Sequence, residues 1–77
     1  MAAYNNTDNL VADKLLRMQL LNIRKSKHLT QQQVSEMSGL SVSTISNLEN
    51  GELTSTSFRS IIAYATALGL EIFIKEK

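Results

Sequence analysis

The sequence predicts an all-α domain of four helices that ends in one short β-strand. Three observations carry this prediction. Apolar residues recur at helical spacing through most of the chain, and proline is absent. The three glycines, Gly39, Gly51 and Gly69, each follow an apolar periodic segment, as helix terminators do. Over the last residues, 70–77, the apolar spacing changes from helical to alternating, which is typical of a strand.

The first helix is expected over residues 8–27, DNLVADKLLRMQLLNIRKSK. Leu16, Leu20 and Ile23 have the i, i+4, i+7 spacing of one buried helical face. A second apolar patch lies on another side of this helix at about 100° per residue, and its members are Leu10, Val11, Leu15, Met18 and Leu21. A chain of this size buries only about 60% of its unfolded surface, so one small core cannot easily cover both patches.

The second helix has a strong start signal in LTQQQV. Thr30 is the expected N-cap, and Gln33 completes a capping box with it. Leu29 and Val34 stand at the positions of a hydrophobic staple. The helix is expected to run to Ser38.

The third helix repeats this start pattern after Gly39, which supplies a left-handed turn residue. Ser41 is the expected N-cap, and Ile45 stands at the staple position. Leu48 completes the inward stripe, and the helix is expected to end near residues 49–50.

The fourth helix is expected to begin at Thr56 or Ser57 and to end before Gly69. Its apolar spacing predicts one buried face. The residues expected in that face are Phe58, Ile61, Ile62, Ala65 and Leu68.

The C-terminal segment LEIFIKEK reads as a strand because apolar residues alternate and β-branched residues are frequent. A lone strand leaves its backbone groups unpaired, and the chain offers no second candidate strand. Another copy of the chain is therefore the simplest partner. The alternative is a last helical turn or a tail without fixed structure. The dimer contacts expected in this segment are Leu70, Ile72, Phe73 and Ile74.

The composition argues against several classes of function. Cysteine is absent and His28 is the single histidine, so a zinc site is not expected. No glycine-rich phosphate loop and no nucleophile beside His28 occur, so we expect neither a cofactor nor catalysis. The first residues lack the features of a signal peptide, and no apolar run approaches the roughly 18 residues of a membrane span. These features favour a cytoplasmic protein.

The net charge of +1 is not the strongly basic footprint of many nucleic-acid binders. Five basic residues nevertheless fall together in the expected first helix with no acid between them: Lys14, Arg17, Arg24, Lys25 and Lys27. The alternative interpretation is a solvated helix whose basic end complements its dipole.

The second and third helices, joined through SGLS, form a helix-turn-helix, in which the second of the two helices enters the major groove of DNA. The third helix presents short polar side chains where a surface helix usually carries long charged ones. Such groups can hydrogen-bond to base edges without bulk. They are Ser41, Ser43, Thr44, Ser46 and Asn47.

Several segments resemble the Cro/C1 type (XRE-like) helix-turn-helix family of repressors. These are LTQ at the second helix, SGLSVSTIS at the turn, LENG after the third helix and ALGL at the end of the fourth, within residues 20–70. The resemblance implies a lambda-repressor-like fold. The expected organisation is a flexible N-terminus at 1–7, a DNA-binding domain at 8–69, and a dimerisation strand and tail at 70–77.

The resemblance also implies roles for particular residues. Phosphate contacts fall on Gln31 and Asn50, with Gln32 as a neighbouring candidate whose alternative is plain solvation. A structural ion pair falls on Arg24 and Glu49. The base-reading positions are Ser41, Val42, Ser43, Thr44 and Asn47.

Val42 departs from the family, whose members often carry Gln or Arg at this position. A bidentate contact with a purine is therefore not expected from Val42. An apolar contact with a thymine methyl group is the expectation instead.

The function expected from these features is sequence-specific regulation of transcription by a dimeric repressor on a palindromic operator. The C-terminal strands would pair about a two-fold axis, helped by the second apolar patch of the first helix. Short members of the family that end in such a strand also resemble antitoxins of toxin–antitoxin modules. The alternative is therefore an antitoxin that binds a toxin and represses its own operon, and the second apolar patch of the first helix and the strand could serve such a foreign partner as easily as a second copy. A repressor from a phage or mobile element fits equally well.

Overall fold

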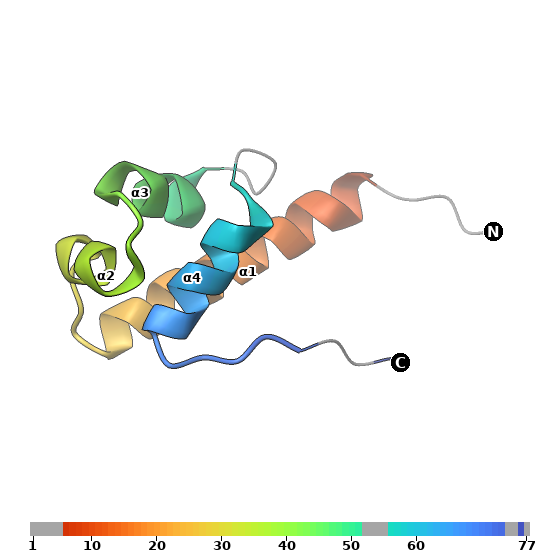
Figure 1. Cartoon of the computed structure of the whole chain (residues 1–77). Coiled ribbons are helices and arrows are strands. Elements are labelled where there is room, and N and C mark those ends of the chain that lie inside the picture. Colours follow the sequence, from red (N-terminus) through yellow and green to blue (C-terminus); the bar gives the residue numbers. More distant parts are fainter. Residues whose placement is uncertain (1–5, 52–55, 74–75, 77) are drawn as a thin grey trace.

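The computed structural model describes residues 6–51, 56–73 and 76, with side chains described from Val11 onward. The described residues form four helices and no strand, which confirms the all-α prediction. The helices are α1 (Asn6–Ser26), α2 (Gln31–Ser38), α3 (Val42–Asn50) and α4 (Phe58–Ala67) (Figure 1). None of these helices is long and apolar enough to cross a membrane.

The helix boundaries follow the local capping signals closely. Thr30 caps α2, and both bonds of the capping box with Gln33 are present, at 3.1 and 2.8 Å. Ser41 caps α3 and Ser57 caps α4 through the backbone N–H groups three residues on. Gly39 ends α2 with φ of 79°, the left-handed conformation that glycine adopts without steric cost. These predictions are confirmed, whereas α1 begins at Asn6, two residues earlier than expected.

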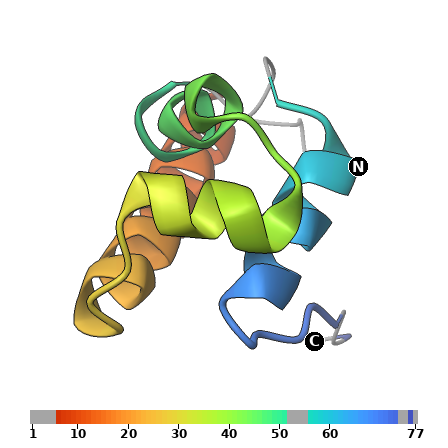
Figure 2. The ribbon, with the colours of Figure 1, turned by 60° about the vertical axis from the view of Figure 1, so that its left-hand side comes forward.

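The core lies where the four helices meet. Its most deeply buried large side chains are Val34 from α2, Ile45 and Leu48 from α3, and Tyr64 from α4. Leu20 of α1, Ile61 of α4 and Leu68 complete the cluster. Figure 2 shows α2 crossing the front of the molecule with α3 above it and α4 to one side.

The buried face of α4 differs from the prediction. Phe58 is 65% exposed and Ile62 is 42% exposed, whereas Tyr64, which was not assigned to the core, is fully buried. One face of a helix covers only three to four positions in two turns. Ile61, Tyr64 and Leu68 occupy that face, and Ile62 is rotated by about 100° away from Ile61.

The expected C-terminal strand is absent from the described part of the tail. Residues 70–73 have no regular secondary structure, and Ile74 lies outside the described residues. A strand requires a partner for its backbone groups, and the described part of this single chain supplies none. Leu70 packs against the core, while Ile72 and Phe73 remain 48% and 79% exposed.

Candidate nucleic-acid interface

The turn between α2 and α3 is fixed by short local contacts. The Ser35 hydroxyl donates to the backbone oxygen of Leu40 at 2.5 Å, and the Leu40 N–H donates to the Ser38 hydroxyl at 3.1 Å. Val34 and Ile45 are both fully buried on either side of this turn. The two helices are therefore held as one unit, as a helix-turn-helix requires.

The outward face of α3 is polar and carries no charge. Ser41, Ser43 and Asn47 are exposed, while Val42 and Thr44 are half-buried. The Ser41 hydroxyl accepts the Thr44 N–H at 3.1 Å and donates to the Thr44 hydroxyl at 2.9 Å, so both side chains also serve the helix cap. The described structure thus brings the five expected base-reading positions to the start and outer side of a single helix.

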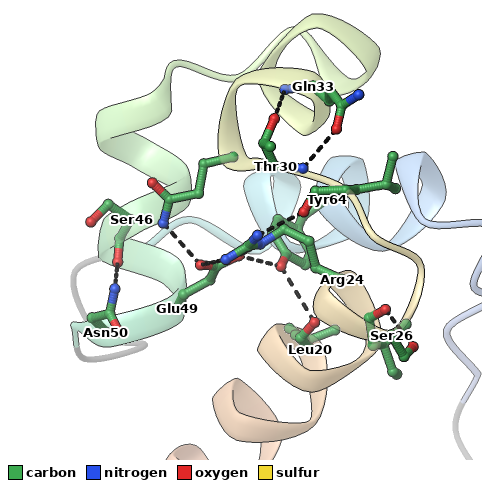
Figure 3. Close-up of polar contacts among 12 residues, drawn as sticks. Leu20, Arg24, Ser26, Thr30, Gln33, Ser46, Glu49, Asn50 and Tyr64 are labelled. Atoms are coloured by element: carbon green, nitrogen blue, oxygen red, sulfur yellow. Dashed lines mark hydrogen bonds and ion pairs between the residues drawn. The ribbon is translucent and has the colours of Figure 1, made fainter.

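The sole acidic residue of α3, Glu49, is turned into the protein, and its side chain has no exposed surface. Arg24 donates to it twice, from Nε to Oε2 at 2.6 Å and from Nη2 to Oε1 at 3.0 Å. Tyr64 donates its hydroxyl to Oε2 at 2.5 Å, and Gln31 donates Nε2 to Oε1 at 3.0 Å (Figure 3). Residues from all four helices therefore meet on one carboxylate.

The pKa values follow from this geometry. Burial alone would raise the pKa of Glu49, but the hydrogen bonds from Arg24, Tyr64 and Gln31 outweigh it, so the pKa is lowered. The hydrogen bond to Glu49 raises the pKa of Arg24 against the opposing influence of burial. Burial, and then the bond to Glu49, raise the pKa of Tyr64. Both members of the Arg24–Glu49 pair thus remain charged at neutral pH, and the outer face of α3 carries no net negative charge.

The three expected phosphate-contacting residues lie at the ends of the two helices. Gln31 is half-buried at the start of α2, where one hydrogen of its side-chain amide is used by Glu49. Asn50 ends α3 and donates its amide to the Ser46 carbonyl at 3.2 Å. Gln32 is exposed and donates to Glu36 at 3.4 Å. An amide carries two hydrogens, so each of these side chains keeps a second donor hydrogen.

Sequence reasoning missed that Tyr64 and Gln31 donate to Glu49. Tyr64 also makes a long contact of 3.4 Å with the Leu20 carbonyl, and Arg24 Nη1 donates to the Leu29 carbonyl at 2.8 Å. A tyrosine inside an otherwise apolar helical stripe was the available signal, since a buried tyrosine hydroxyl usually finds a hydrogen-bond partner. Its partner could not be identified because Glu49 lies on another helix.

The basic cluster is divided by the fold. Arg24 is committed to Glu49, and Arg17 pairs with Asp13 at 2.8 Å on the same helix. Lys14, Lys25 and Lys27 are exposed. The cluster is therefore partly structural rather than one continuous basic surface.

Gly51 closes α3 at a point where any larger residue would collide with Asn47 of that helix. Its N–H donates to the Asn47 carbonyl at 2.7 Å, and an added Cβ would lie 2.5 Å from that same oxygen. We expect Gly51→Ala to distort the last turn of α3 and to lower the free energy of unfolding by about 1–3 kcal/mol, measured by urea denaturation.

The double variant Gly51→Ala/Asn47→Ala is the matched control. It removes the Asn47 side-chain oxygen, which would lie 2.9 Å from the new Cβ, but keeps the closer backbone oxygen. Gly51→Ala should therefore be less stable than the parent, and the double variant should be less stable than Asn47→Ala. Parental stability of Gly51→Ala would show that the last turn adapts freely.

Comparisons with known proteins agree with this geometry. A family model described as Helix-turn-helix matches residues 20–74. The chain is 32% identical over 62 residues to the protein named "Putative antitoxin HigA2" of Mycobacterium tuberculosis. The aligned segment covers 80% of this chain. The chain spans only about 61% of that relative's length. No solved structure gives a significant match.

The matched span contains α2, the turn, α3 and α4, and it includes every expected base-reading and phosphate-contacting position. It covers more than half of the chain. The protein therefore belongs to the Cro/C1 type (XRE-like) helix-turn-helix family of DNA-binding domains.

Proposed function

We propose that this protein is a sequence-specific transcription regulator, most simply a repressor, that places α3 in the major groove of DNA. The observation that supports the proposal best is the outer face of α3, where exposed short polar side chains stand on a helix whose only acid is buried and neutralised. A groove-facing helix needs small hydrogen-bonding groups and no negative charge beside the phosphates.

The reading positions are proposed to divide their work by exposure. Ser43 and Asn47 are exposed and would bond to base edges, while Val42 is half-buried and would touch a thymine methyl group. Ser41 and Thr44 would contribute from the capped end of the helix.

Phosphate contacts are proposed for the second amide hydrogen of Gln31 and for Gln32 and Asn50. Glu49 holds the Gln31 amide from one side at 3.0 Å, so the free hydrogen of that amide has a restricted direction. An amide that is already oriented loses less conformational entropy on binding. The buried ion pair would thereby support DNA binding without touching DNA.

A second copy of the chain is the proposed partner on DNA. The tail and α4 expose large apolar side chains around one groove of about 750 Å³, lined by Phe58, Ile62, Thr66, Leu70, Glu71, Ile72 and Phe73. Aromatic side chains bury about 150–250 Å² each, so covering Phe58 and Phe73 would remove on the order of 300 Å² per protomer. Pairing of the tails as antiparallel strands would add to this, toward the roughly 800 Å² per partner of a stable interface.

Selection of duplexes from a random DNA pool by the purified chain tests the proposal. An enriched palindrome with half-sites about 10 bp apart is expected, because a two-fold dimer places two reading helices one helical turn apart. Retention without any enriched sequence, lost steeply with added salt, would refute sequence-specific binding.

Asn47→Ala is expected to weaken binding to the selected operator by about 1–3 kcal/mol and to relax the preference at the base pairs under Asn47. The measurement is a titration of operator variants by fluorescence anisotropy. Ser46→Ala is the matched control, because Ser46 is a half-buried member of the same helix outside the proposed reading set. An equal loss of affinity for every duplex would mean that Asn47 does not read bases.

The alternative function is an antitoxin that binds and neutralises a protein toxin and represses its own operon. The likeness to the protein named "Putative antitoxin HigA2" favours it. Expression of the protein encoded by a neighbouring gene should then arrest growth, and co-expression of this chain should restore it. Arrest that this chain does not relieve would count against the antitoxin function and would leave the DNA-binding proposal to the duplex selection.

A further inference from the structure

The outer side of α1 carries three large apolar side chains that nothing in the described structure covers. Val11, Leu15 and Met18 are 53%, 55% and 47% exposed. Their i, i+4, i+7 spacing places them within about 60° on the helix, opposite the buried Leu20. We call these three residues the α1 stripe.

The α1 stripe is separate from the groove proposed for the dimer. The side of α1 that meets α4 and the tail carries Leu16, Gln19 and Ile23, about 100° around the helix from the stripe. The stripe also precedes residue 20, where the family match begins. It therefore lies outside the span matched by the family model and outside the groove proposed for the dimer, although the sequence analysis expected this patch to help a dimer or to serve a foreign partner.

One edge of the α1 stripe is basic. Lys14 is exposed beside the stripe, and Lys25 is exposed on the same side of the helix about two turns beyond Met18. Among the described side chains of α1, the only acid is Asp13, which lies toward the core and is bonded to Arg17 at 2.8 Å. No described acid of α1 neutralises this basic edge.

We propose that the α1 stripe is a docking surface for another protein that offers an apolar helix or ridge flanked by acidic side chains. Charge complementarity selects this occupant. In an antiparallel two-fold contact between copies, the side of one α1 that carries Lys14 and Lys25 would face the same side of the other. An acidic edge converts that repulsion into attraction.

The position of the stripe also means that this partner and DNA bind together, a consequence that rests on the proposed function. α1 and α3 pack on each other through their inner sides, with Arg24 and Glu49 between them. Their outer sides therefore point apart. In Figure 1 the N-terminal half of α1 extends away from α2 and its turn to α3.

Two synthetic amphipathic peptides of about 20 residues, long enough to form a helix, test the proposal. Both carry the same leucine stripe, one flanked by glutamates and the other by lysines. Fluorescence anisotropy with the full chain should show the acidic peptide binding at least ten-fold more tightly than the basic one. Leu15→Glu should abolish binding of the acidic peptide, and Lys14→Glu/Lys25→Glu should reverse the preference.

Lys27→Glu/His28→Glu is the control, because it introduces acidic side chains beyond the end of α1 and should leave the preference unchanged. Equal binding of the two peptides, or no binding of either, overturns the proposal. Loss of self-association in Leu15→Glu by analytical ultracentrifugation would assign the stripe to a second copy instead. Leu15-dependent binding to phosphatidylglycerol vesicles would assign it to a lipid surface, and both outcomes overturn the proposal.

Addition of a selected operator duplex to the peptide complex tests simultaneous binding. The affinity for the peptide should change less than two-fold when the duplex is bound. Competition between duplex and peptide would overturn simultaneous binding. If no duplex is selected at all, the DNA-binding proposal fails, while the peptide preference still decides the docking surface by itself.

Discussion

Arg24→Ala is expected to lower the free energy of unfolding by about 3–5 kcal/mol, because it leaves the Glu49 carboxylate buried without its ionic partner. The Glu49 side chain has no exposed surface, and Arg24 provides two of its four hydrogen bonds. Urea denaturation at neutral pH measures the loss. A change below about 1 kcal/mol would mean that water reaches the carboxylate and that the pair behaves as a surface ion pair.

The double variant Arg24→Met/Glu49→Leu separates the worth of the pair from the cost of breaking it. Apolar residues of similar volume often replace a buried ion pair with little loss of stability. Here Tyr64 and Gln31 would lose their acceptor, so stability between that of the parent and that of Arg24→Ala is expected. Because Gln31 is then no longer held, the double variant should bind operator DNA more weakly than its stability suggests.

Titration of Glu49 should change the free energy of unfolding of Arg24→Ala in the opposite direction to that of the parent. In the parent the pKa of Glu49 is lowered. The stability that the ionised carboxylate contributes is therefore complete above the unfolded pKa of about 4.3 and is lost as the pH falls through the folded pKa. Without Arg24, its hydrogen bonds and charge no longer oppose the effect of burial, and we expect the pKa of Glu49 to rise. Acidification from pH 7 toward 4 should then narrow the stability difference between parent and variant.

Features that depend on neighbouring residues in the sequence were predictable. The Thr30–Gln33 capping box and the Ser41 cap join groups three residues apart, so their sequence pattern determines their geometry. The Arg24–Glu49 pair, 25 residues apart, entered the sequence analysis only through the family resemblance. The Tyr64 hydroxyl could not be placed at all, because its acceptor lies on a different helix, 15 residues away in the sequence.

The apolar pattern of α4 and the tail was ambiguous for a different physical reason. Phe58 and Ile62 satisfy helical periodicity as well as Ile61 and Leu68 do, because α4 has apolar residues on two sides. Periodicity identifies apolar sides but does not tell which one meets the core. The alternating apolar residues of the tail predicted a strand, but a strand needs a partner for its backbone groups, and the described part of the chain offers none.

Ile72→Asp is expected to weaken operator binding by about 10²–10⁴-fold. A monomer would bind each DNA half-site separately, whereas in a dimer the binding of one α3 holds the other at high effective concentration near the second half-site. Ile72 is 48% exposed beside the groove that Phe58 and Ile62 line. A charge there would be buried without a partner in the proposed dimer. The four helices should keep their stability, since Ile72 lies outside the core cluster.

Leu15→Asp is the matched control, because it places the same charge on an equally exposed apolar residue away from that groove. Sedimentation equilibrium should show a monomer for Ile72→Asp and a dimer for both the parent and Leu15→Asp. Titration of a single half-site should then give equal affinities for all three proteins, because reading by α3 is unchanged. A parental operator affinity in Ile72→Asp would mean that the tail does not join the two copies, and that a dimer, if it forms, uses another surface.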